Sequence, residues 1–513
     1  MLTAFQSPEE LEEGQEFVWD RCLNDQMFVF QENELDRILD IIITNMTPQR
    51  SPSQKPVPAN ILFLSARYAH YHASAELLEK LLVSAMDKIN DVVEKHQWDM
   101  TILAFWISNA TLLLHYLKKD NNLVQVTTEF QLQIAELINE IFILIIRDAE
   151  RRMDKVLDQA MLEHETIPGF EDVQFQHEWK IFRSKPKVKP PEPMEKRFRP
   201  PSPKRRAQPS PRNITSLLSS TLFVLDLYDI HSVITAQVLS QLIYWLSAEL
   251  FNRIMSNRKY LARTKAMQIR MNISTLEDWA RSNNRQPEHY ENGSMTSTGE
   301  NTVESARRHL EPLVQLLQWL QCFSSLGEDI ESLSGTLQQL PRLTAQQLLH
   351  AAKYYRPEVG EKGISKSARK YITDLQKAAA DRKAANRAKP RQSSGVPSPN
   401  PQQQKGADTS PSTPVKPTHN SLGSHSPAPS RLSDEEERED APDDLLLDPS
   451  YMLPFSLPTS TDMLISYGAG FGGVNKERER KYLPTVPPEF LAKLDLNGKK
   501  NGDSLYDERR WEE

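Results

Sequence analysis

The sequence has few of the features that mark secreted or membrane-spanning proteins. Among 513 residues there are two cysteines, Cys22 and Cys322, which excludes a disulfide framework and suits a reducing compartment. The amino-terminal segment has no basic region followed by an apolar run, so we expect no secretory signal. The most apolar run, residues 141–146, is far too short to span a bilayer. We therefore expect a cytoplasmic protein.

Motifs of common catalytic and nucleotide-binding sites are also missing. There is no GxSxG elbow, P-loop, HExxH motif or kinase signature, and the twelve histidines do not cluster. Gly468, Gly470 and Gly473 match GxGxxG, but prolines lie on both sides and no strand–turn–helix unit surrounds them. We interpret these glycines as part of an extended segment that lies close against a helical surface.

Two further candidates for reactive chemistry have structural explanations. Residues 163–165, Glu-His-Glu, are adjacent, so on a helix their side chains diverge and cannot share one metal ion. Pro168 and Gly169 follow, and we interpret the group as the polar end of a helix. Cys322 lies in an apolar string and is expected to pack rather than react. The sequence predicts no enzyme activity, no catalytic or metal-binding residue and no cofactor.

What the sequence does contain is a 3.6-residue apolar periodicity, without the alternation typical of strands. It covers residues 59–119, 130–161, 229–250 and 303–322. The second stretch is long enough to exceed 25 residues, so we expect its helix to cross between two packing layers. The fold class predicted is all-α, a multi-helix bundle.

Two inserts interrupt this helical pattern. Hydrophobic residues make up only 38% of the chain and there are 35 prolines, a mixture that predicts an ordered body with disordered inserts. Residues 183–212 contain eleven Lys or Arg and two Glu, a local charge of 11 − 2 = +9, together with nine prolines. Residues 388–442 are rich in Ser, Pro and Gln and end in an acidic block.

The basic insert is a candidate binding segment. Its cations suit an anionic membrane or nucleic acid, but Phe198 is the only interleaved aromatic residue, so nucleic acid is not expected. Polyproline matches with flanking cations also suit modules that bind proline motifs, although such matches arise by chance in linkers of this composition. The residues concerned are Lys187, Pro190, Pro193, Pro200, Pro203, Lys204, Arg205 and Arg206.

Seven residues of the inserts are candidate phosphorylation sites, because each precedes a proline or an acidic block. Phosphate there would subtract positive charge and weaken contacts with partners. They are Ser202, Ser210, Ser398, Ser410, Thr413, Ser426 and Ser433.

Several strings, taken in chain order, together carry a resemblance to a known family. They are ILFLSARYAHY from Ile61, FWISNATLLLHYLK from Phe105, MLEHETIPG from Met161, LARTKAMQIRMNISTLEDWARSNN from Leu261, LEPLVQLLQWLQ from Leu310, LTAQQLLHAAKYYRP from Leu343 and LLLDPSYMLPFSLPTSTDMLISYGAGFGG from Leu445. They resemble the dilute (DIL) domain, the cargo-binding globular tail of class V myosins. The large inserts resemble the fungal branch, in which a DIL domain accompanies ankyrin repeats, although this sequence contains no ankyrin repeat, motor domain or heptad coiled coil.

The most specific part of the resemblance lies in residues 265–279. Its motif residues are Lys265, Met267, Gln268, Ile269, Arg270, Asn272, Leu276, Glu277 and Trp279. Most of them are expected to be structural, with Met267, Ile269, Leu276 and Trp279 in the core and Arg270 paired with Glu277 or with a backbone end.

The resemblance implies two stacked helical subdomains joined by a long helix, with a C-terminal strap folded back along them. The expected divisions are helical halves at 1–182 and 213–387, inserts at 183–212 and 388–442, and the strap and tail at 443–513. It also implies a non-catalytic scaffold that binds protein adaptors or organelle receptors in membrane traffic, at Golgi, vesicle or other organelle membranes. The alternative hypothesis is a peripheral membrane protein that its basic insert holds against anionic lipid.

Overall fold

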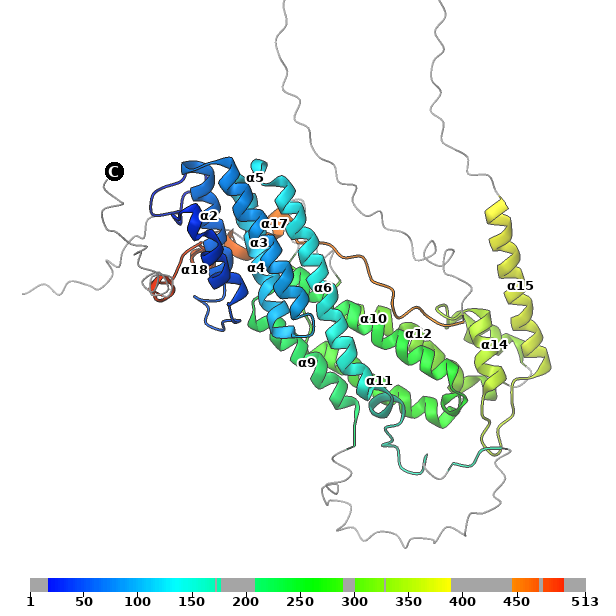
Figure 1. Ribbon diagram of the computed structural model, residues 1–513. Helices are drawn as coiled ribbons and strands as arrows, with labels where there is room; N and C mark the ends of the chain where they lie inside the picture. The colour runs from blue at the N-terminus through cyan, green and yellow to red at the C-terminus, as the bar shows by residue number, and fades with distance from the viewer. Residues whose placement is uncertain are drawn as a thin grey trace, which may run out of the picture.

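The computed structural model describes residues 17–170, 173–176, 208–288, 300–326, 329–388, 445–469 and 474–492. These residues build an elongated helical body, with the N-terminal helices at one end and α14 and α15 at the other (Figure 1). Within the described ranges there is no β-strand, only one bridge between Phe175 and Glu358. The all-α fold class predicted from periodicity is confirmed.

In the first half, the other helices gather around α4. Ser74 begins α3 by accepting a hydrogen bond from the Leu77 amide at 3.2 Å, and Asp99 begins α4 by accepting one from Thr101 at 2.9 Å. The elements are α1 (Leu35–Leu39), a π-helical turn (Asp40–Thr44), α2 (Val57–His72), α3 (Ala75–Lys95), α4 (Met100–Lys119) and α5 (Leu123–Val126).

Helix α4 is the one described helix that is long and apolar enough to cross a membrane. Most of its side chains are buried between α2, α3, α6 and α9, including Phe105 and Trp106. A helix that is apolar on all sides and covered on all sides is a core helix, and α4 fits that description.

Helix α6 (Thr128–Leu157) joins the two halves. Its 30 residues span about 45 Å, and it packs on α3 and α4 in the first half and on α9 and α10 in the second. It ends in a π-helical turn, Asp158–Leu162. Both halves share one continuous buried apolar cluster, so the body folds around a single core.

The second half surrounds α10, which contacts α6, α9 and α12. Helix α11 packs on α9 and α12, and α14 and α15 cover the far end (Figure 1). The elements are α9 (Pro211–Leu227), α10 (Ser232–Ser256), α11 (Arg263–Ser282), α12 (Thr302–Cys322), α13 (Ile330–Gln338), α14 (Ala345–Tyr354) and α15 (Lys366–Ala388). The C-terminal elements α17 (Ser460–Leu464), a π-helical turn (Ile465–Ala469) and α18 (Lys476–Lys481) lie instead at the end with the N-terminal helices, where α17 packs on α4 (Figure 1).

The start of α9 corrects the predicted end of the basic insert. The insert was expected to reach Arg212, but α9 begins at Pro211 with Ser210 as its N-cap. The Ser210 amide donates to Asn213 Oδ1 at 2.8 Å, and Pro at the first helical position needs no hydrogen-bond partner. The last residues of the predicted insert therefore belong to the helical body.

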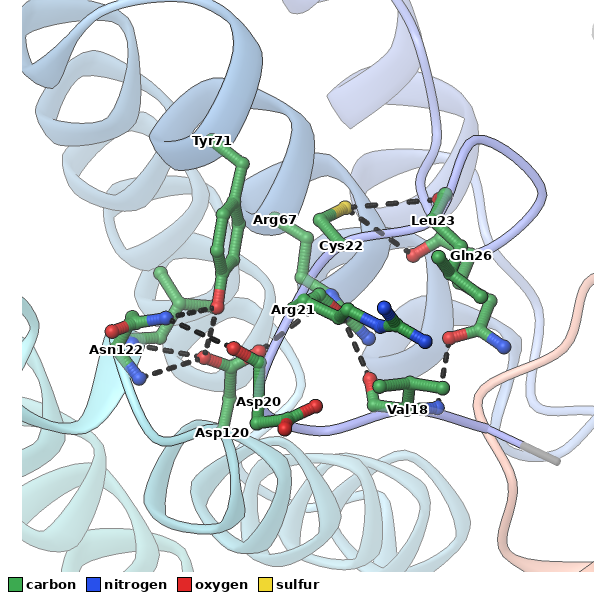
Figure 2. A network of polar contacts seen from close by, with 11 residues as sticks. Val18, Asp20, Arg21, Cys22, Leu23, Gln26, Arg67, Tyr71, Asp120 and Asn122 are labelled. Carbon is green, nitrogen blue, oxygen red and sulfur yellow. Dashed lines mark hydrogen bonds and ion pairs between the residues drawn. The ribbon is translucent and has the colours of Figure 1, made fainter.

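The N-terminal segment is fixed by a buried ion pair between α2 and the end of α4. Arg67 and Asp120 are fully buried, with Arg67 Nε 3.5 Å from Asp120 Oδ2. Figure 2 shows Arg67 also donating hydrogen bonds to the carbonyls of Val18, at 2.9 Å, and Arg21.

Asp120 has hydrogen-bond partners of its own. Its Oδ1 accepts hydrogen bonds from Tyr71 Oη at 3.1 Å and from the Asn122 and Leu123 amides. The pair thus ties a chain terminus to two helices.

A cluster of charges fills the junction between α6 and α10. Arg253 forms ion pairs with Glu249 at 3.1 Å and with Asp158 at 2.8 Å, and a further short one with Asp154. Glu150 lies on the same side of α6, near Glu249. Burial, opposed by Arg147 and reinforced by Glu249, raises the pKa of Glu150 from 4.5 to about 7.

The raised pKa makes stability depend on pH. Between about pH 4.5 and 7 the folded chain holds a proton on Glu150 that the unfolded chain has lost. Glu150 therefore lowers the stability of the fold fully above pH 7, and this loss of stability disappears as the pH falls to about 4.5. We expect Glu150→Gln to raise the urea midpoint at pH 8, and the gain to shrink at pH 5. Glu140→Gln, exposed on the same helix, should change little at either pH. An equal gain at both pH values would contradict this assignment.

Candidate functional site: the strap groove on α10

Residues 445–458, here called the strap, run along α10 without helix or strand, and a hydrogen bond from the Tyr451 amide to the Asp448 carbonyl closes a turn near the middle. In Figure 1 the strap is the orange segment that lies beside α10 and α12 and leads into α17. Its direction is opposite to that of α10, because Leu447 lies at Asn252 and Ser456 lies at Gln237. Strap and helix are therefore aligned over roughly 15 residues of α10.

Three amide side chains of α10 bind the main chain of the strap. Asn252 donates to the Leu447 carbonyl and accepts from the Leu447 amide, both at 2.8 Å. Gln237 makes the same pair of hydrogen bonds with Ser456, both at 2.8 Å. Because each side-chain amide carries N–H donors and a carbonyl acceptor, it can pair with the N–H and C=O of a backbone as a neighbouring strand would.

Gln241 supplies the central pair of contacts. It donates to the Tyr451 carbonyl at 3.0 Å and accepts from the Leu453 amide at 2.8 Å. Its side chain is 1% exposed. We call Gln237, Gln241 and Asn252 the amide ladder. Because the ladder contacts only N–H and C=O groups, it recognises an extended backbone and not a particular sequence.

Side chains add a smaller set of contacts. Phe455 stacks on Phe142 of α6 with ring centroids 4.3 Å apart, and Tyr451 meets Tyr244 edge-on at 5.9 Å. Tyr244 Oη also donates to the Asp448 carbonyl at 2.7 Å. Most strap side chains remain half-buried or exposed. The strap is thus held both through its backbone and by partly buried apolar side chains that pack against the core, namely Leu445, Leu447, Met452, Phe455 and Leu457.

The segment after the strap is anchored differently. Tyr467 is buried against His115 of α4 and His231 at the start of α10, with ring centroids 5.0 and 6.0 Å away. Burial lowers the pKa of His115 to about 3, so this imidazole is neutral near pH 7. Met463 is also buried. Asp462, Met463, Ile465 and Tyr467 are therefore buried in the body, whereas the apolar side chains of the strap are only partly buried against it.

A hollow of about 220 Å³ lies beside the strap. Leu453 and Pro454 form one wall, and Phe142, Val233 and Ala236 form the apolar floor. At its rim His309 Nε2 lies 3.1 Å from Ser240 Oγ, and burial lowers the pKa of His309 to about 4. Glu300 and Arg308 also line the hollow and pair with each other at 3.1 Å, so an apolar floor faces a rim of paired charges and a neutral histidine.

A larger, polar hollow of about 540 Å³ lies where the α9–α10 turn meets α18. Its charges are paired: Asp229 accepts from Lys55 and Lys481, both at 3.0 Å, and Ser466 Oγ donates to Glu288 at 2.9 Å. Asp229, in the α9–α10 turn, thus binds both Lys481 of α18 and Lys55 before α2, so these contacts join segments from three parts of the chain.

The acidic string near residue 163 does not form a metal site. Glu163 pairs with Lys259 at 2.9 Å, Glu165 pairs with Lys265, and His164 offers its carbonyl to Asn272. The helix ends at Leu162, and Gly169 has a φ of 87°, as expected for the turn that follows. In the part of the chain that the structure describes, no three His, Cys, Asp or Glu side chains are grouped as metal ligands.

Cys322 and the glycines of the GxGxxG match were the other candidates from the sequence. The Cys322 thiol is half-buried, donates weakly to the Trp319 carbonyl at 3.7 Å, and has its pKa raised by burial. The interpretation of Gly468 is wrong: it lies in the π-helical turn, and no atom lies within 4 Å of the place a Cβ would take. Gly470 and Gly473 lie outside the described residues.

The family motif of α11 clamps the chain between the two halves. Gln268 Oε1 accepts the amides of Thr166 and Ile167, both at 2.9 Å. Asn272 Nδ2 donates to the carbonyls of Met161 and His164, both at 3.0 Å, and the two amides bind each other at 3.1 Å. Two of the strings that carry the resemblance are thus bound to one another.

The remaining motif residues serve packing and surface contacts. Ile269, Leu276 and Trp279 are buried, and Trp279 donates to Ser219 Oγ at 2.8 Å. The expectation that Met267 lies in the core is wrong, since its side chain is 39% exposed. Arg270 and Glu277 do pair, at 3.1 Å on the helix surface.

Most residues predicted in the inserts cannot be placed. The candidate binding residues of the basic insert, and all candidate phosphorylation sites except Ser210, lie outside the described residues. Ser210 is the N-cap of α9, where its backbone amide and hydroxyl both face Asn213.

Comparison with known proteins matches the second half to a family model. The DIL domain model matches residues 237–359, which run from within α10 to beyond α14. A dilute domain-containing protein of Schizosaccharomyces pombe is 35% identical over 349 residues, covering 67% of this chain and 58% of that protein. This chain is a DIL-domain protein. The DIL domain therefore contains Gln237, Gln241 and Asn252, the whole amide ladder.

More distant relatives include myosins. Human unconventional myosin-Vb is 24% identical over 358 residues, which cover 64% of this DIL protein and 17% of the myosin. A solved structure described as a myosin V cargo binding domain aligns with a TM-score of 0.49 at 17% identity, over 70% of this chain and 85% of the other. The family assignment rests on the sequence matches. This chain spans little more than half the length of the Schizosaccharomyces pombe protein.

Sequence reasoning missed the amide ladder. Its members lie at i, i+4 and i+15 of one helix, within an otherwise apolar pattern. The available signal was Gln241, a polar residue in the middle of a helix whose apolar stripe is wide enough to bury it.

Proposed function

We propose that this chain is a non-catalytic protein-binding module of intracellular membrane traffic or organelle transport, and that adaptor proteins or organelle receptors bind along its helical surface. One observation carries the proposal: α10, within the DIL domain, already holds an extended peptide segment by its main chain. A surface that accommodates one extended segment suits peptide recognition. The relatedness to class V myosins supports a role in transport.

Proximity labelling in the cells that express the full chain tests this function. We expect the labelled proteins to be enriched in those of one organelle surface or transport machinery, relative to an unrelated cytosolic protein carrying the same label. Labelling dominated by ribosomal or nuclear proteins would count against the proposal.

The net charge of the basic insert favours a second candidate function, attachment to anionic membranes. Each cation near such a surface contributes about 1 kcal/mol. Deleting residues 183–207, which spares the Ser210 cap of α9, should abolish pelleting with phosphatidylserine vesicles and leave partner labelling intact if the insert binds lipid. Unchanged pelleting would identify the insert as a spacer.

A further inference from the structure

We propose that the amide ladder is a binding groove for an extended peptide of a protein partner, and that the strap is its exchangeable intramolecular occupant. The inference rests on the proposed function and specifies the site at which it acts. The partner envisaged is an extended segment in place of Leu447 to Ser456, with free backbone N–H groups at the positions of Leu447, Leu453 and Ser456. An aromatic residue would take the place of Phe455 on Phe142.

The mode of binding makes exchange possible. All three ladder amides pair with main-chain groups, so another chain can make the same six hydrogen bonds provided that it has no proline at the positions of Leu447, Leu453 and Ser456. Specificity would come from the stacking position of Phe455 and from the hollow beside Leu453. This division between backbone affinity and side-chain selection is typical of extended-peptide recognition.

The strap is also poorly buried compared with the segment that follows it. Leu446 and Tyr451 are 41% and 50% exposed, and between residues 445 and 458 only Pro458 is buried. Segments with few buried apolar contacts open locally without unfolding the remainder. Met463 and Tyr467, in contrast, stay within the core and keep the strap tethered when it opens.

A partner peptide must bind the amide ladder more tightly than the strap does, because the strap is part of the same chain. A flexible tether gives the strap an effective concentration of about millimolar. The hollow supplies the advantage, because its 220 Å³ beside Leu453 is unfilled by the strap. A larger apolar side chain at that position would bury additional surface over Val233 and Ala236, which is expected to raise affinity by about tenfold or more.

The test uses the full chain and a fluorescent peptide of residues 445–459. Leu453→Pro with Ser456→Pro removes two strap N–H donors and leaves the ladder intact. Leu446→Pro is the control, since this exposed strap residue is not packed against the core and its amide makes no hydrogen bond to α10. We expect the peptide to bind the first variant at least tenfold more tightly than the unmodified chain, and the control variant to resemble the unmodified chain.

Two changes then test the mode of recognition. Adding Gln237→Ala and Gln241→Ala to the first variant should weaken peptide binding at least tenfold. An N-methyl group on Leu453 of the peptide should do the same, whereas one on Met452 should have less than a twofold effect. The peptide with Leu453→Trp should bind about tenfold more tightly than the strap sequence. Equal binding by the two N-methylated peptides, or binding unaffected by the glutamine changes, would overturn the proposal.

Hydrogen exchange of the unmodified chain gives an independent measurement should the proline variant fold poorly. The amides of Leu447, Leu453 and Ser456 should exchange at least tenfold faster than that of Met463, and equal protection would contradict an exchangeable strap. If the peptide fails to bind while partner labelling persists, the groove proposal fails and the proposed function stands. If the peptide binds but no transport protein is labelled, the proposed function fails and the groove proposal stands.

Discussion

Replacing Arg67 by methionine should lower the free energy of unfolding by about 3–5 kcal/mol, because it leaves the fully buried Asp120 carboxylate without its cation. The same change removes the donor to the Val18 and Arg21 carbonyls and the guanidinium that lies 4.7 Å from the Phe17 ring. The N-terminal segment should therefore lose protection from hydrogen exchange before the helices do. Urea denaturation followed by circular dichroism measures the first effect.

A surface pair provides the control for this experiment. Lys80 and Glu32 lie 2.8 Å apart, but both side chains are at least half exposed. Lys80→Met should shift the urea midpoint far less than Arg67→Met, because water screens an exposed ion pair. Adding Asp120→Asn to Arg67→Met should restore part of the loss, because the unpaired charge is then removed. A double variant as unstable as the single one would show that packing, and not charge, explains the effect.

The extent to which the sequence predicted this fold follows from how each element is stabilised. Helices α4, α6, α10 and α12 are buried along an apolar face, so their periodicity is visible in the sequence. Helix α15 has no such stripe: beyond Ile372 its described side chains are mostly exposed, so no apolar periodicity marks this helix in the sequence. Apolar patterning therefore predicts the helices that are buried in the core, but it does not predict helices that extend away from the core and are exposed.

Within the predicted helices, the burial predicted for a residue was wrong where an apolar side chain lies off the buried face. On α11, Ala266, Ile269 and Ile273 are buried, and Met267 lies 100° around the helix from Ala266. Its apolar character suggested the core, but the helical geometry places it outside. The ladder was missed for the opposite reason, since the use of Gln241 depends on a segment more than 200 residues away in the chain.

Gln268→Ala should lower the free energy of unfolding by about 1–3 kcal/mol, because it leaves the amides of Thr166 and Ile167 without acceptors in a partly buried site. It also removes the donor to Asn272 Oδ1, which orients Asn272 toward the Met161 carbonyl. Urea denaturation measures the loss. Hydrogen exchange should show increased opening of the turn at residues 163–168, the segment that connects the first half to the second.

The neighbouring Met267 offers a control on the same helix. Met267→Ala changes an exposed side chain and should alter stability by no more than about 0.5 kcal/mol. Gln268→Glu keeps an acceptor for Thr166 and Ile167 but loses the donor to Asn272, so its loss should be smaller than that of Gln268→Ala. If Gln268→Ala were as mild as Met267→Ala, the clamp would have no energetic role. The specificity of this motif would then have to come from a partner that contacts α11 from outside.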